Sequence, residues 1–297
     1  MKKYSYTICA CARMEENNIL EWLTYHQIIG VEKFYIYGND DDYRVLGDVL
    51  LQIMRNSDLV TFVHYRDVGA QRNMYIHFLQ HFAHLSKWVS FIDLDEFIGL
   101  KAYKDLSELI NSVPSQFGSI QLNWLNYGPS NFIERPLGSV LRNYKYRSQF
   151  LDIHTKHITK TEEFYKYGVA GPFWHSLDSG KVNTCNILGD KISSWNSIND
   201  IREREIYRQY LMLNNEKIIN LACIYHFVLK SENDFKRRLE RSTQGDFNNQ
   251  LMYRKYIENP SAAHEYIRSL NEVYDDSLSN FWDAQLAKKY GDKFYIV

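Results

Sequence analysis

Hydrophobic and polar positions follow two distinct patterns along the first hundred residues. Short apolar runs rich in aromatic and β-branched residues predict buried strands, at residues 4–12, 31–37, 58–64 and 88–93. Between these runs, apolar side chains recur at helical spacing and predict helices, at residues 19–29, 43–55 and 71–86. Gly30 follows the first of these segments as the expected C-cap. Strands and helices that alternate through short connections predict a parallel or mixed sheet with helices on both faces.

The pattern changes after residue 100. The later predicted segments are a helix, a strand and a loop-rich region with isolated strands, at residues 106–113, 118–128 and 131–195. A loop-rich region of this kind commonly builds a binding site. The rest of the chain has a mainly helical pattern. We therefore expect an α/β core with acceptor loops at residues 1–197, and a helical part at residues 198–297 that packs on this core.

Composition narrows the class of protein. Of the 297 residues, 45% are hydrophobic, which allows a sizeable core. The net charge of −1 argues against nucleic acid as the main partner, because no basic excess is present to neutralise phosphates. The 23 Tyr, 16 Phe and 6 Trp residues include candidates for binding sugar rings, although most are expected in the core.

The expected location is the cytoplasm. The four cysteines are too few and too scattered for a disulfide framework and are expected to be buried thiols in a reducing compartment. The sequence shows no secretory signal pattern and no apolar stretch of membrane-spanning length. Peripheral association with the inner face of the membrane stays open as an alternative.

An acidic cluster follows the apolar run that begins at Trp88. Asp93, Asp95 and Glu96 fall within four positions. A buried strand does not hold three unpaired negative charges, so these side chains are expected where the strand emerges at the edge of the sheet. In α/β sheets this edge is where ligands bind. An Asp-x-Asp pair suits Mg²⁺ or Mn²⁺, which often share their ligands with substrate phosphates. The alternative is a solvated strand end without a metal.

Several blocks along the chain, in this order and spacing, resemble GT-A-fold glycosyltransferases of the family 92 type and the related family 2-like bacterial enzymes. The blocks are Arg13-Met14-Glu15, Glu21-Trp22, Tyr25-His26, Gly30-Val31, the acidic turn 37–42, the metal motif 88–97, Asn123 to Gly128, and Tyr225-His226-Phe227 with Lys230-Ser231, Phe235, Arg238 and Arg241. The resemblance covers about residues 4–245. Gly38 departs from the pattern, since an Asp is common there, and Asp40, Asp41 or Asp42 is expected to compensate.

The resemblance implies an α/β fold of the GT-A, Rossmann-like type, with a mixed sheet, flanking helices and a helical C-terminal region. It implies a metal-dependent glycosyltransferase that uses Mn²⁺ or Mg²⁺. The donor would be a UDP-sugar, and the transferred group a hexose such as galactose. The acceptor would be a glycan or glycolipid in the synthesis of a surface polysaccharide or lipooligosaccharide, with inversion at the anomeric carbon.

The resemblance also assigns site residues. The expected metal ligands are Asp93, Asp95 and His226, and Glu96 is expected to orient the metal shell or the sugar hydroxyls. The residues expected to bind the donor nucleotide and its diphosphate are Ala10, Arg13, Glu15, Asp40, Arg72, Asp93, Lys156, Lys230 and Arg241. His226 and Lys230 would be contributed by the C-terminal helical part.

The acceptor side is expected to involve aromatic and polar side chains. The candidates are Trp124, Asn126, Trp174 and His175. Inversion needs a carboxylate that takes the proton of the acceptor hydroxyl, and Asp178, beside the last two, is the first candidate. The other carboxylates in the loop-rich region that fit this role are Asp152, Glu162, Glu163 and Asp190.

Two other functions fit parts of the pattern. A nucleotidyltransferase also pairs carboxylates with Mg²⁺, but no Gly-rich phosphate loop follows the first strand. A glycan-binding protein that keeps the fold without catalysis is the second alternative. A glycosidase is disfavoured, because carboxylates two residues apart on one strand end do not flank a bond from opposite faces.

Overall fold

The computed structural model of the chain describes residues 2–67, 70–167, 182–192, 201–241 and 251–290. Contacts within the chain separate two compact units. The first unit consists of Met1–Trp124 and Phe150–Ile224, and the second of Leu125–Gln149 and Tyr225–Val297. Each unit is described by itself below.

The first unit holds most of the strands. Its elements are β1 (Tyr4–Ala12), α1 (Ile19–Ile28), β2 (Lys33–Gly38), α2 (Arg44–Asn56), β3 (Val60–His64), α3 (Gln71–His81), the 3-10 helix η1 (Ala83–Leu85), β4 (Ser86–Phe91), β5 (Glu96–Leu100), α4 (Leu106–Ser112), β6 (Ser119–Asn126), β8 (Thr155–Lys160), α6 (Thr161–Tyr167), β9 (Thr184–Asn186), α7 (Ile201–Leu221) and β10 (Ala222–His226). The last two residues of β6 and of β10 belong to the second unit.

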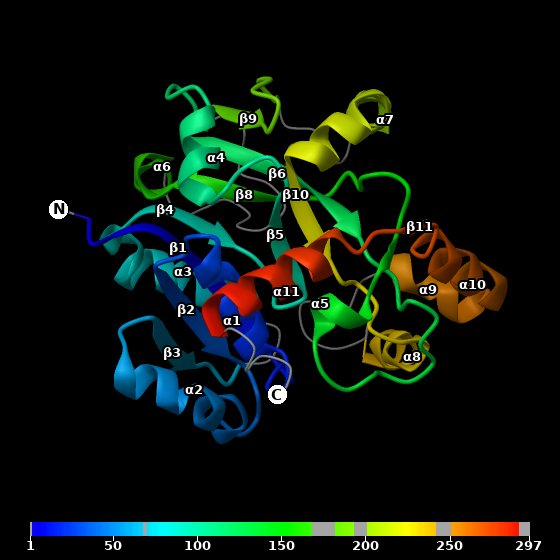
Figure 1. The fold of residues 1–297 in the computed structure, drawn as a ribbon, viewed down its shortest axis with the longest axis horizontal. Coiled ribbons are helices and arrows are strands. Elements are labelled where there is room, and N and C mark those ends of the chain that lie inside the picture. The colour runs from blue at the N-terminus through cyan, green and yellow to red at the C-terminus, as the bar shows by residue number, and fades with distance from the viewer. Residues whose placement is uncertain (1, 68–69, 168–181, 193–200, 242–250, 291–297) are drawn as a thin grey trace. The chain divides into compact units, whose positions relative to one another are not determined.

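The strands form one mixed sheet in the order β3-β2-β1-β4-β8-β6-β10-β5, with β9 paired to β6 (Figure 1). The pairs β1–β2, β2–β3 and β1–β4 are parallel, whereas β8 runs antiparallel to both β4 and β6. Consequently the carboxyl ends of β1, β2 and β4 share one edge of the sheet with the amino end of β8. This edge is where ligands bind in α/β sheets.

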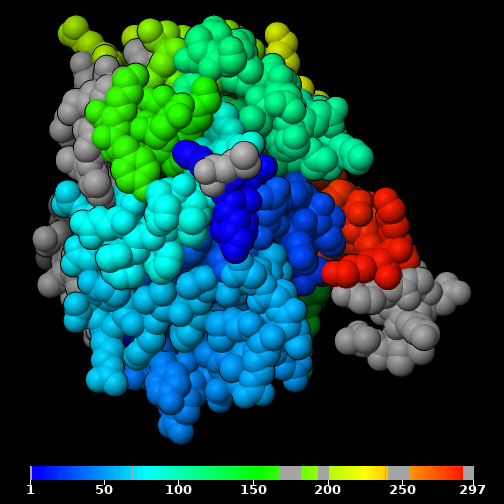
Figure 2. Space-filling model, turned by 90° about the vertical axis from the view of Figure 1, so that its left-hand side faces the viewer, coloured from blue at the N-terminus to red at the C-terminus, as the bar shows by residue number. Residues whose placement is uncertain are grey.

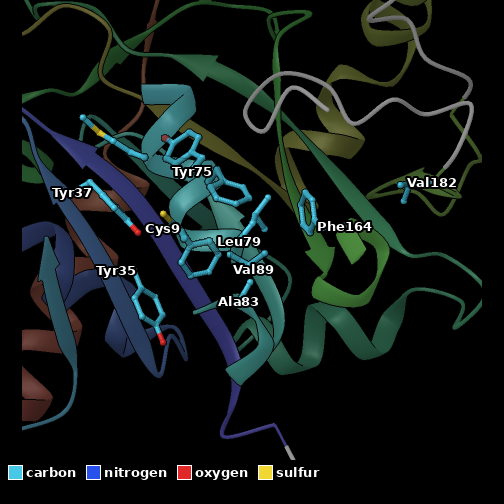
Figure 3. Packing of buried hydrophobic residues seen from close by; sticks show 12 residues of the cluster. Cys9, Tyr35, Tyr37, Tyr75, Leu79, Ala83, Val89, Phe164 and Val182 are labelled. Carbon is cyan, nitrogen blue, oxygen red and sulfur yellow. The ribbon is translucent and has the colours of Figure 1, made fainter. Parts of the chain in front are cut away.

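Helices α3 and α6 cover one face of the parallel strands (Figure 3). Alternate strand residues point to this face, as the period of two along a strand requires. The buried cluster that they form with the two helices contains Cys9, Tyr35, Tyr37, Met74, Tyr75, Phe78, Leu79, Ala83, Val89, Phe91, Phe164 and Val182. Figure 2 shows α2, α3, α4 and α6 at the surface of this unit, around the amino end of β1.

Helix α1 is joined to β5 by three hydrogen bonds from aromatic side chains. Trp22 Nε1 donates to the Glu96 carbonyl at 2.8 Å, and Tyr25 Oη donates to the Ile98 carbonyl at 2.9 Å. His26 Nε2 accepts from the Ile98 amide at 3.3 Å. All three side chains are buried. Because β5 ends the strand order, these side chains bind the backbone groups on its outer edge. The Glu-Trp and Tyr-His blocks of the sequence therefore attach α1 to the strand that begins at Glu96.

The second unit contains short strands and helices. Its elements are α5 (Val140–Asn143), β7 (Tyr146–Arg147), α8 (Glu232–Arg241), α9 (Leu251–Glu258), α10 (Pro260–Ser269), β11 (Val273–Tyr274) and α11 (Ser277–Tyr290). Leu229, Phe235 and Leu270 form its small buried cluster. Strands β7 and β11 pair antiparallel. Across the described parts of the chain, no helix has the length and apolar character needed to span a bilayer.

The fold class predicted from the sequence, a mixed α/β sheet with flanking helices, is confirmed. The strands and helices predicted before residue 113 are present with shifts of a few residues, and β4 ends at Phe91 instead of residue 93. Three strands were not predicted, β5, β10 and the two-residue β11. β10 has five buried residues inside a segment with a helical pattern, which is too short a run to stand out. The expected domain boundary at residues 197 and 198 lies outside the described residues and stays a prediction.

Candidate active site

A tight turn follows β4 and carries the acidic cluster. The Glu96 amide donates to the Asp93 carbonyl at 3.1 Å, which closes the turn. The Asp93 amide donates to Glu96 Oε2 at 3.0 Å, so the Glu96 side chain folds back over the start of the same turn. Two carboxylates are thereby held close together at the ligand-binding edge of the sheet. Asp95, between them, is partly exposed.

The ammonium group of Lys156 lies between these two carboxylates. Its Nζ is 2.8 Å from Asp93 Oδ2 and 3.2 Å from Glu96 Oε2. The side chain of Lys156 is 1% exposed and that of Glu96 is fully buried, whereas that of Asp93 is 35% exposed. Burial favours the neutral amine, but Asp93 and Glu96 outweigh it and raise the pKa of Lys156 above its usual value. This site therefore contains a fixed positive charge supplied by β8.

Glu96 is the least favourably placed of these charged groups, because its carboxyl is buried and only partly hydrogen-bonded. Burial raises the pKa of its carboxyl well above the usual range, and Lys156 opposes this shift only in part. Its second oxygen, Oε1, is buried and has no hydrogen-bond partner among the described residues. Glu96 is thus not the first residue of a solvated turn, which was the alternative interpretation of the sequence.

Helix α3 holds the other side of Asp93. Gln71 Nε2 donates to Asp93 Oδ1 at 3.0 Å and lies 2.9 Å from the Tyr75 hydroxyl. Both oxygens of Asp93 are thus engaged, one by Gln71 and one by Lys156. The sequence interpretation did not assign a role to Gln71, because an amide at the start of an amphipathic helix carries no distinguishing signal. The arrangement fixes the orientation of the Asp93 carboxylate.

A further acidic residue, Asp40, lies at the same edge, just after the carboxyl end of β2. Asp40 is 7% exposed, and its Oδ1 accepts from the Met14 amide at 2.8 Å. Its Oδ2 is buried and has no hydrogen-bond partner in the described structure. Arg13 donates to the Asn39 carbonyl at 2.7 Å. Met14 adopts a φ of 58°, a conformation uncommon for a residue other than glycine.

The other predicted donor-binding residues of the first unit differ in accessibility. Ala10 is fully buried within β1, so only its backbone is available for a role. Glu15 accepts a hydrogen bond from Asn18 at 2.8 Å at the start of α1. Arg72 is exposed on the first turn of α3, next to Gln71.

Trp124 lies on β6 beside the start of β8. The ring of His154 stacks on it with a centroid distance of 5.1 Å and an interplanar angle of 28°. Lys156 Nζ is 6.0 Å from the centroid of the same indole. His154 was not predicted. The alternation Asp152, His154, Lys156 was a usable signal, since residues two apart point to one side of an extended chain.

Four predicted residues, Asn126, His226, Lys230 and Arg241, belong to the second unit. His226 is buried, and its Nδ1 lies 3.0 Å from Asn126 Oδ1. Lys230 is also buried, and its carbonyl accepts from the Tyr144 hydroxyl at 2.5 Å. The structure thus brings His226 and Asn126 together, a pair that the sequence had assigned to different roles. Arg241 ends α8, but its side chain is outside the described part of the chain.

The remaining predicted residues lie outside the described residues. These are Trp174, His175 and Asp178. Within the described residues, no group of three or more His, Cys, Asp or Glu side chains is arranged to hold a metal ion. A cavity of about 320 Å³ occurs elsewhere in the first unit, and of the candidates named from the sequence its described lining contains Asp190 alone.

Comparison with known proteins gives the family. The sequence profile of glycosyltransferase family 92 matches residues 4–183, which is more than half of the chain. A glycosyltransferase family 92 protein of Oryza sativa subsp. japonica is 28% identical over 149 residues, 49% of this chain and 25% of that protein. One of Ricinus communis is 27% identical over 165 residues, 54% of this chain and 29% of that protein. The chain thus spans less than a third of the length of these curated relatives.

Solved structures show a more distant likeness. S. aureus TarS 1-349 is similar with a TM-score of 0.38 and 13% identity, over 57% of this chain and 50% of that one. GalNAc-T7 with UDP, GalNAc and Mn²⁺ is similar with a TM-score of 0.37 and 9% identity, over 55% of this chain and 36% of that one. The match of the family profile over the region that contains the acidic turn and Lys156 decides the assignment: the chain belongs to glycosyltransferase family 92.

Proposed function

We propose that this chain is a metal-dependent glycosyltransferase that moves a hexose, with galactose as the first candidate, from a UDP-sugar to a glycan or glycolipid acceptor. One observation carries the proposal. At the ligand-binding edge of the sheet, Asp93 is held by Gln71 and Lys156 and remains about one-third exposed. Family membership supports the same class of reaction.

The carboxylates fit a hard divalent cation. Mg²⁺ is commonly held by one or two carboxylates, with substrate phosphates and water completing its ligands. Asp93 and Asp95 offer such oxygen ligands at a partly exposed turn, and the buried oxygen of Glu96 lies just behind them. Lys156 offsets part of the negative charge of the turn, which lowers the repulsion between its carboxylates. We propose that Asp93 and Asp95 hold Mn²⁺ or Mg²⁺, with His226 as a further ligand.

The metal would neutralise part of the negative charge that develops on the departing diphosphate. The residues of the chain would bind and orient the two substrates. Asp40, which is 7% exposed, and Arg13, which donates to the neighbouring Asn39 carbonyl, are the nucleotide contacts that we propose at the carboxyl ends of β1 and β2. The other donor contacts that we propose are those of Ala10, Glu15, Arg72, Lys230 and Arg241. The role of Lys156 is to orient Asp93, since its buried ammonium already bonds that carboxylate.

The acceptor would bind beside Trp124. This indole is partly exposed and lies next to Lys156, so a sugar ring on it would be close to the acidic turn. Asn126, Trp174 and His175 are further proposed acceptor contacts. A glycolipid acceptor would bring the protein to the inner face of the membrane, in agreement with the expected cytoplasmic location and a role in surface polysaccharide synthesis.

Calorimetric titration with UDP, with and without Mn²⁺, tests the proposal. We expect UDP affinity to rise in the presence of Mn²⁺, and hydrolysis of one or more UDP-hexoses to be detectable. Asp93→Asn and Asp95→Asn should each lower the transfer rate by a factor of about 100 or more, because the cation loses a charged ligand. The control is Asp48→Asn, an exposed position on α2.

Two outcomes would contradict the proposal. Full transfer activity in either turn variant would remove the metal assignment. Glycan binding without any affinity for UDP would replace the enzyme with a glycan-binding protein of the same fold.

A further inference from the structure

The cavity of about 320 Å³ is lined by the end of β9, the turn that follows this strand and the first half of α7, all within the first unit. Pockets that bind small molecules usually have volumes of about 300–1,000 Å³. The cavity therefore has room for a ligand about the size of a sugar ring. Its lining includes aromatic, amide and charged side chains, among them Asn186, Asp190, Lys191, Glu203, Tyr207 and Tyr210.

The turn after β9 fixes the position of Tyr210. Asn186 Oδ1 accepts from the amides of Leu188 and Asp190 at 3.0 and 2.9 Å, and the Asn186 amide donates to the Asp190 carbonyl at 3.0 Å. The side chains of Asn186 and Asp190 then hold the Tyr210 hydroxyl, which accepts from Asn186 Nδ2 and donates to Asp190 Oδ2, each at 2.6 Å. This wall of the cavity is thus ordered before a ligand binds, which lowers the entropic cost of binding.

A polar face of the sheet fixes the position of Tyr207. Its hydroxyl accepts from Gln121 Nε2 at 2.9 Å and donates to Asn123 Oδ1 at 3.0 Å. A buried sheet face is usually apolar, so a polar one costs hydrophobic burial and is typical of a functional site. On β6 and in register on β8, the buried polar residues of this face are Ser119, Gln121, Asn123, Thr155, His157 and Thr159.

The chemistry of the lining favours an uncharged ligand with many hydroxyl groups. The rings of Tyr207 and Tyr210 are nearly parallel, with an interplanar angle of 10° and a centroid distance of 6.1 Å. The C–H face of a sugar ring packs on such rings, while its hydroxyls donate to carboxylates, here Asp190 and Glu203, and accept from an ammonium group, here Lys191. Two carboxylates against one ammonium disfavour an anion such as a nucleoside diphosphate, so the cavity does not suit the donor.

The cavity lies at the same edge of the sheet as the acidic turn. β8 runs antiparallel to both β4 and β6, and β9 runs parallel to β6, so the turns that follow β4 and β9 emerge at one edge. In the order β4, β8, β6, β9 these turns are three strand spacings apart, which is about 14 Å. A glycan whose reacting end lies at the acidic turn would therefore reach the cavity with a more distant sugar unit.

We propose that this cavity is a saccharide-binding subsite that holds a distal sugar of the acceptor, away from the bond that is formed. The inference rests on the proposed glycosyltransferase function and specifies its acceptor as a neutral glycan of several sugar units. Tyr210 supplies the aromatic face and Asp190 accepts from the sugar hydroxyls. Asp190, one of the carboxylates considered for proton transfer, binds the acceptor in this proposal.

Calorimetric titration with a panel of neutral hexasaccharides tests the inference, using cellohexaose, maltohexaose, mannohexaose, xylohexaose and galactohexaose. We expect at least one of them to bind. Tyr210→Ala and Asp190→Ala should each lower its affinity by a factor of about 10 or more, because an aromatic face or a charged acceptor is lost. Tyr210→Phe keeps the ring and should retain most of the affinity. UDP affinity in the presence of Mn²⁺ should not change in any of these variants.

The matched control is Tyr165→Ala. Tyr165, on α6, is 49% exposed, and its hydroxyl is also hydrogen-bonded, to the Leu79 carbonyl at 2.9 Å. This variant should bind the hexasaccharide like the unaltered protein. With the hexasaccharide as acceptor, Tyr210→Ala should raise KM and leave kcat unchanged, because the subsite lies away from the reacting atoms. With the corresponding disaccharide, which is too short to reach the cavity, KM should stay the same.

Three results would overturn the inference. The first is that the unaltered protein binds none of the hexasaccharides, and the second is that Tyr210→Ala and Asp190→Ala bind them as tightly as the unaltered protein does. The third is that spermidine, as a cationic probe, binds with an affinity that these two variants lose and that hexasaccharides do not compete with. If a hexasaccharide binds at the cavity but the protein neither binds UDP nor hydrolyses any UDP-hexose, the proposed function fails and the saccharide site remains.

Discussion

Both units contain a buried ion pair, and the two pairs differ in how completely their hydrogen-bonding groups are used. In the second unit, Arg147 Nε donates to Asp275 Oδ2 at 2.8 Å, with side chains 9% and 8% exposed. The guanidinium also donates to the Ser148 carbonyl at 2.9 Å, and Asp275 Oδ1 accepts from the amide and hydroxyl of Ser277 at 3.1 and 2.5 Å. In the first unit, Lys156 is shared by two carboxylates, and Glu96 Oε1 has no partner among the described residues.

The difference separates a structural ion pair from a candidate site. The Arg147–Asp275 pair joins β7 to the residue that follows β11, next to the antiparallel pairing of these two strands, and it has one charge of each sign. The acidic turn places the carboxyl groups of Asp93 and Glu96 on one ammonium, and burial raises the pKa of Glu96 well above its usual range. A cation bound at the partly exposed carboxylates of this turn would favour their ionised forms.

The largest expected change in the free energy of unfolding concerns Arg147, in the second unit. Arg147→Met should lower the free energy of unfolding by about 3–5 kcal/mol, because Asp275 is left buried without its cation. Urea unfolding monitored by circular dichroism measures this. The double variant Arg147→Met with Asp275→Leu should recover most of the loss, and a double variant as unstable as the single one would contradict the description of the pair as replaceable.

A smaller change in the free energy of unfolding is expected at His26, a neutral buried side chain whose two ring nitrogens are both hydrogen-bonded. His26 uses both ring nitrogens, since Nδ1–H donates to the Trp22 carbonyl at 2.8 Å and Nε2 accepts from the Ile98 amide. Burial lowers the pKa of His26 to about 3, and the same cause lowers that of His157 to about 3. Between pH 6.5 and 3 the unfolded chain therefore binds protons that the folded chain does not, so stability falls as the pH falls.

Comparison with a His26 variant isolates the contribution of His26, because the other groups with shifted pKa values, among them His157, His77 and Glu96, are the same in both proteins. A histidine that is buried and neutral contributes about 1.4 kcal/mol per pH unit once the pH is well below 6.5. Urea unfolding at pH 7.0, 6.0 and 5.5 measures it, in a range above the titration of most carboxylates. His26→Gln should be less stable at every pH, and its slope should be smaller by the contribution of His26. An unchanged slope would show that His26 is protonated in the folded state.

The smallest change in the free energy of unfolding is expected at Glu96, whose hydrogen bonding is incomplete. Glu96→Gln keeps an oxygen that can accept from Lys156 and the Asp93 amide while it removes a buried charge. The lost attraction to Lys156 and the relieved desolvation oppose each other, so the free energy of unfolding should change by less than about 1 kcal/mol. If this variant loses 3 kcal/mol or more of its free energy of unfolding, the Glu96–Lys156 contact is a structural ion pair like that of Arg147 and Asp275.

Sequence patterns predicted the regular part of the fold and the acidic turn. The apolar runs that form β1, β2, β3 and β4 are strong signals, because each is rich in β-branched and aromatic residues and is bounded by polar residues. β2 is buried throughout and β1 nearly so, whereas β3 is mostly half-buried and β4 is buried mainly in its last three residues. β10 and β5 are short, with five residues each, and lie next to segments with other patterns. β5 also depends on hydrogen bonds from Trp22, Tyr25 and His26, which are contacts between residues more than 70 positions apart.

The site was predicted where chemistry is local in the chain and missed where it is not. Asp93, Asp95 and Glu96 are neighbours in sequence, so their combined charge was visible. Gln71 and His154 enter the site through the packing of α3 and the antiparallel course of β8, and no local pattern encodes either contact. Lys156 was expected to contact the donor, which stays a prediction; its contacts with Asp93 and Glu96 were not visible in the sequence, because they join residues about 60 positions apart.

The three aromatic side chains of α1 also determine what can happen at one end of the sheet. An exposed terminal strand presents free amide and carbonyl groups, to which a strand of another molecule can add. On β5 the indole, phenol and imidazole of Trp22, Tyr25 and His26 already occupy the carbonyls of Glu96 and Ile98 and the amide of Ile98. Sheet extension between molecules is blocked there, and a helix inside the same chain supplies the protection against aggregation that a further strand would otherwise provide.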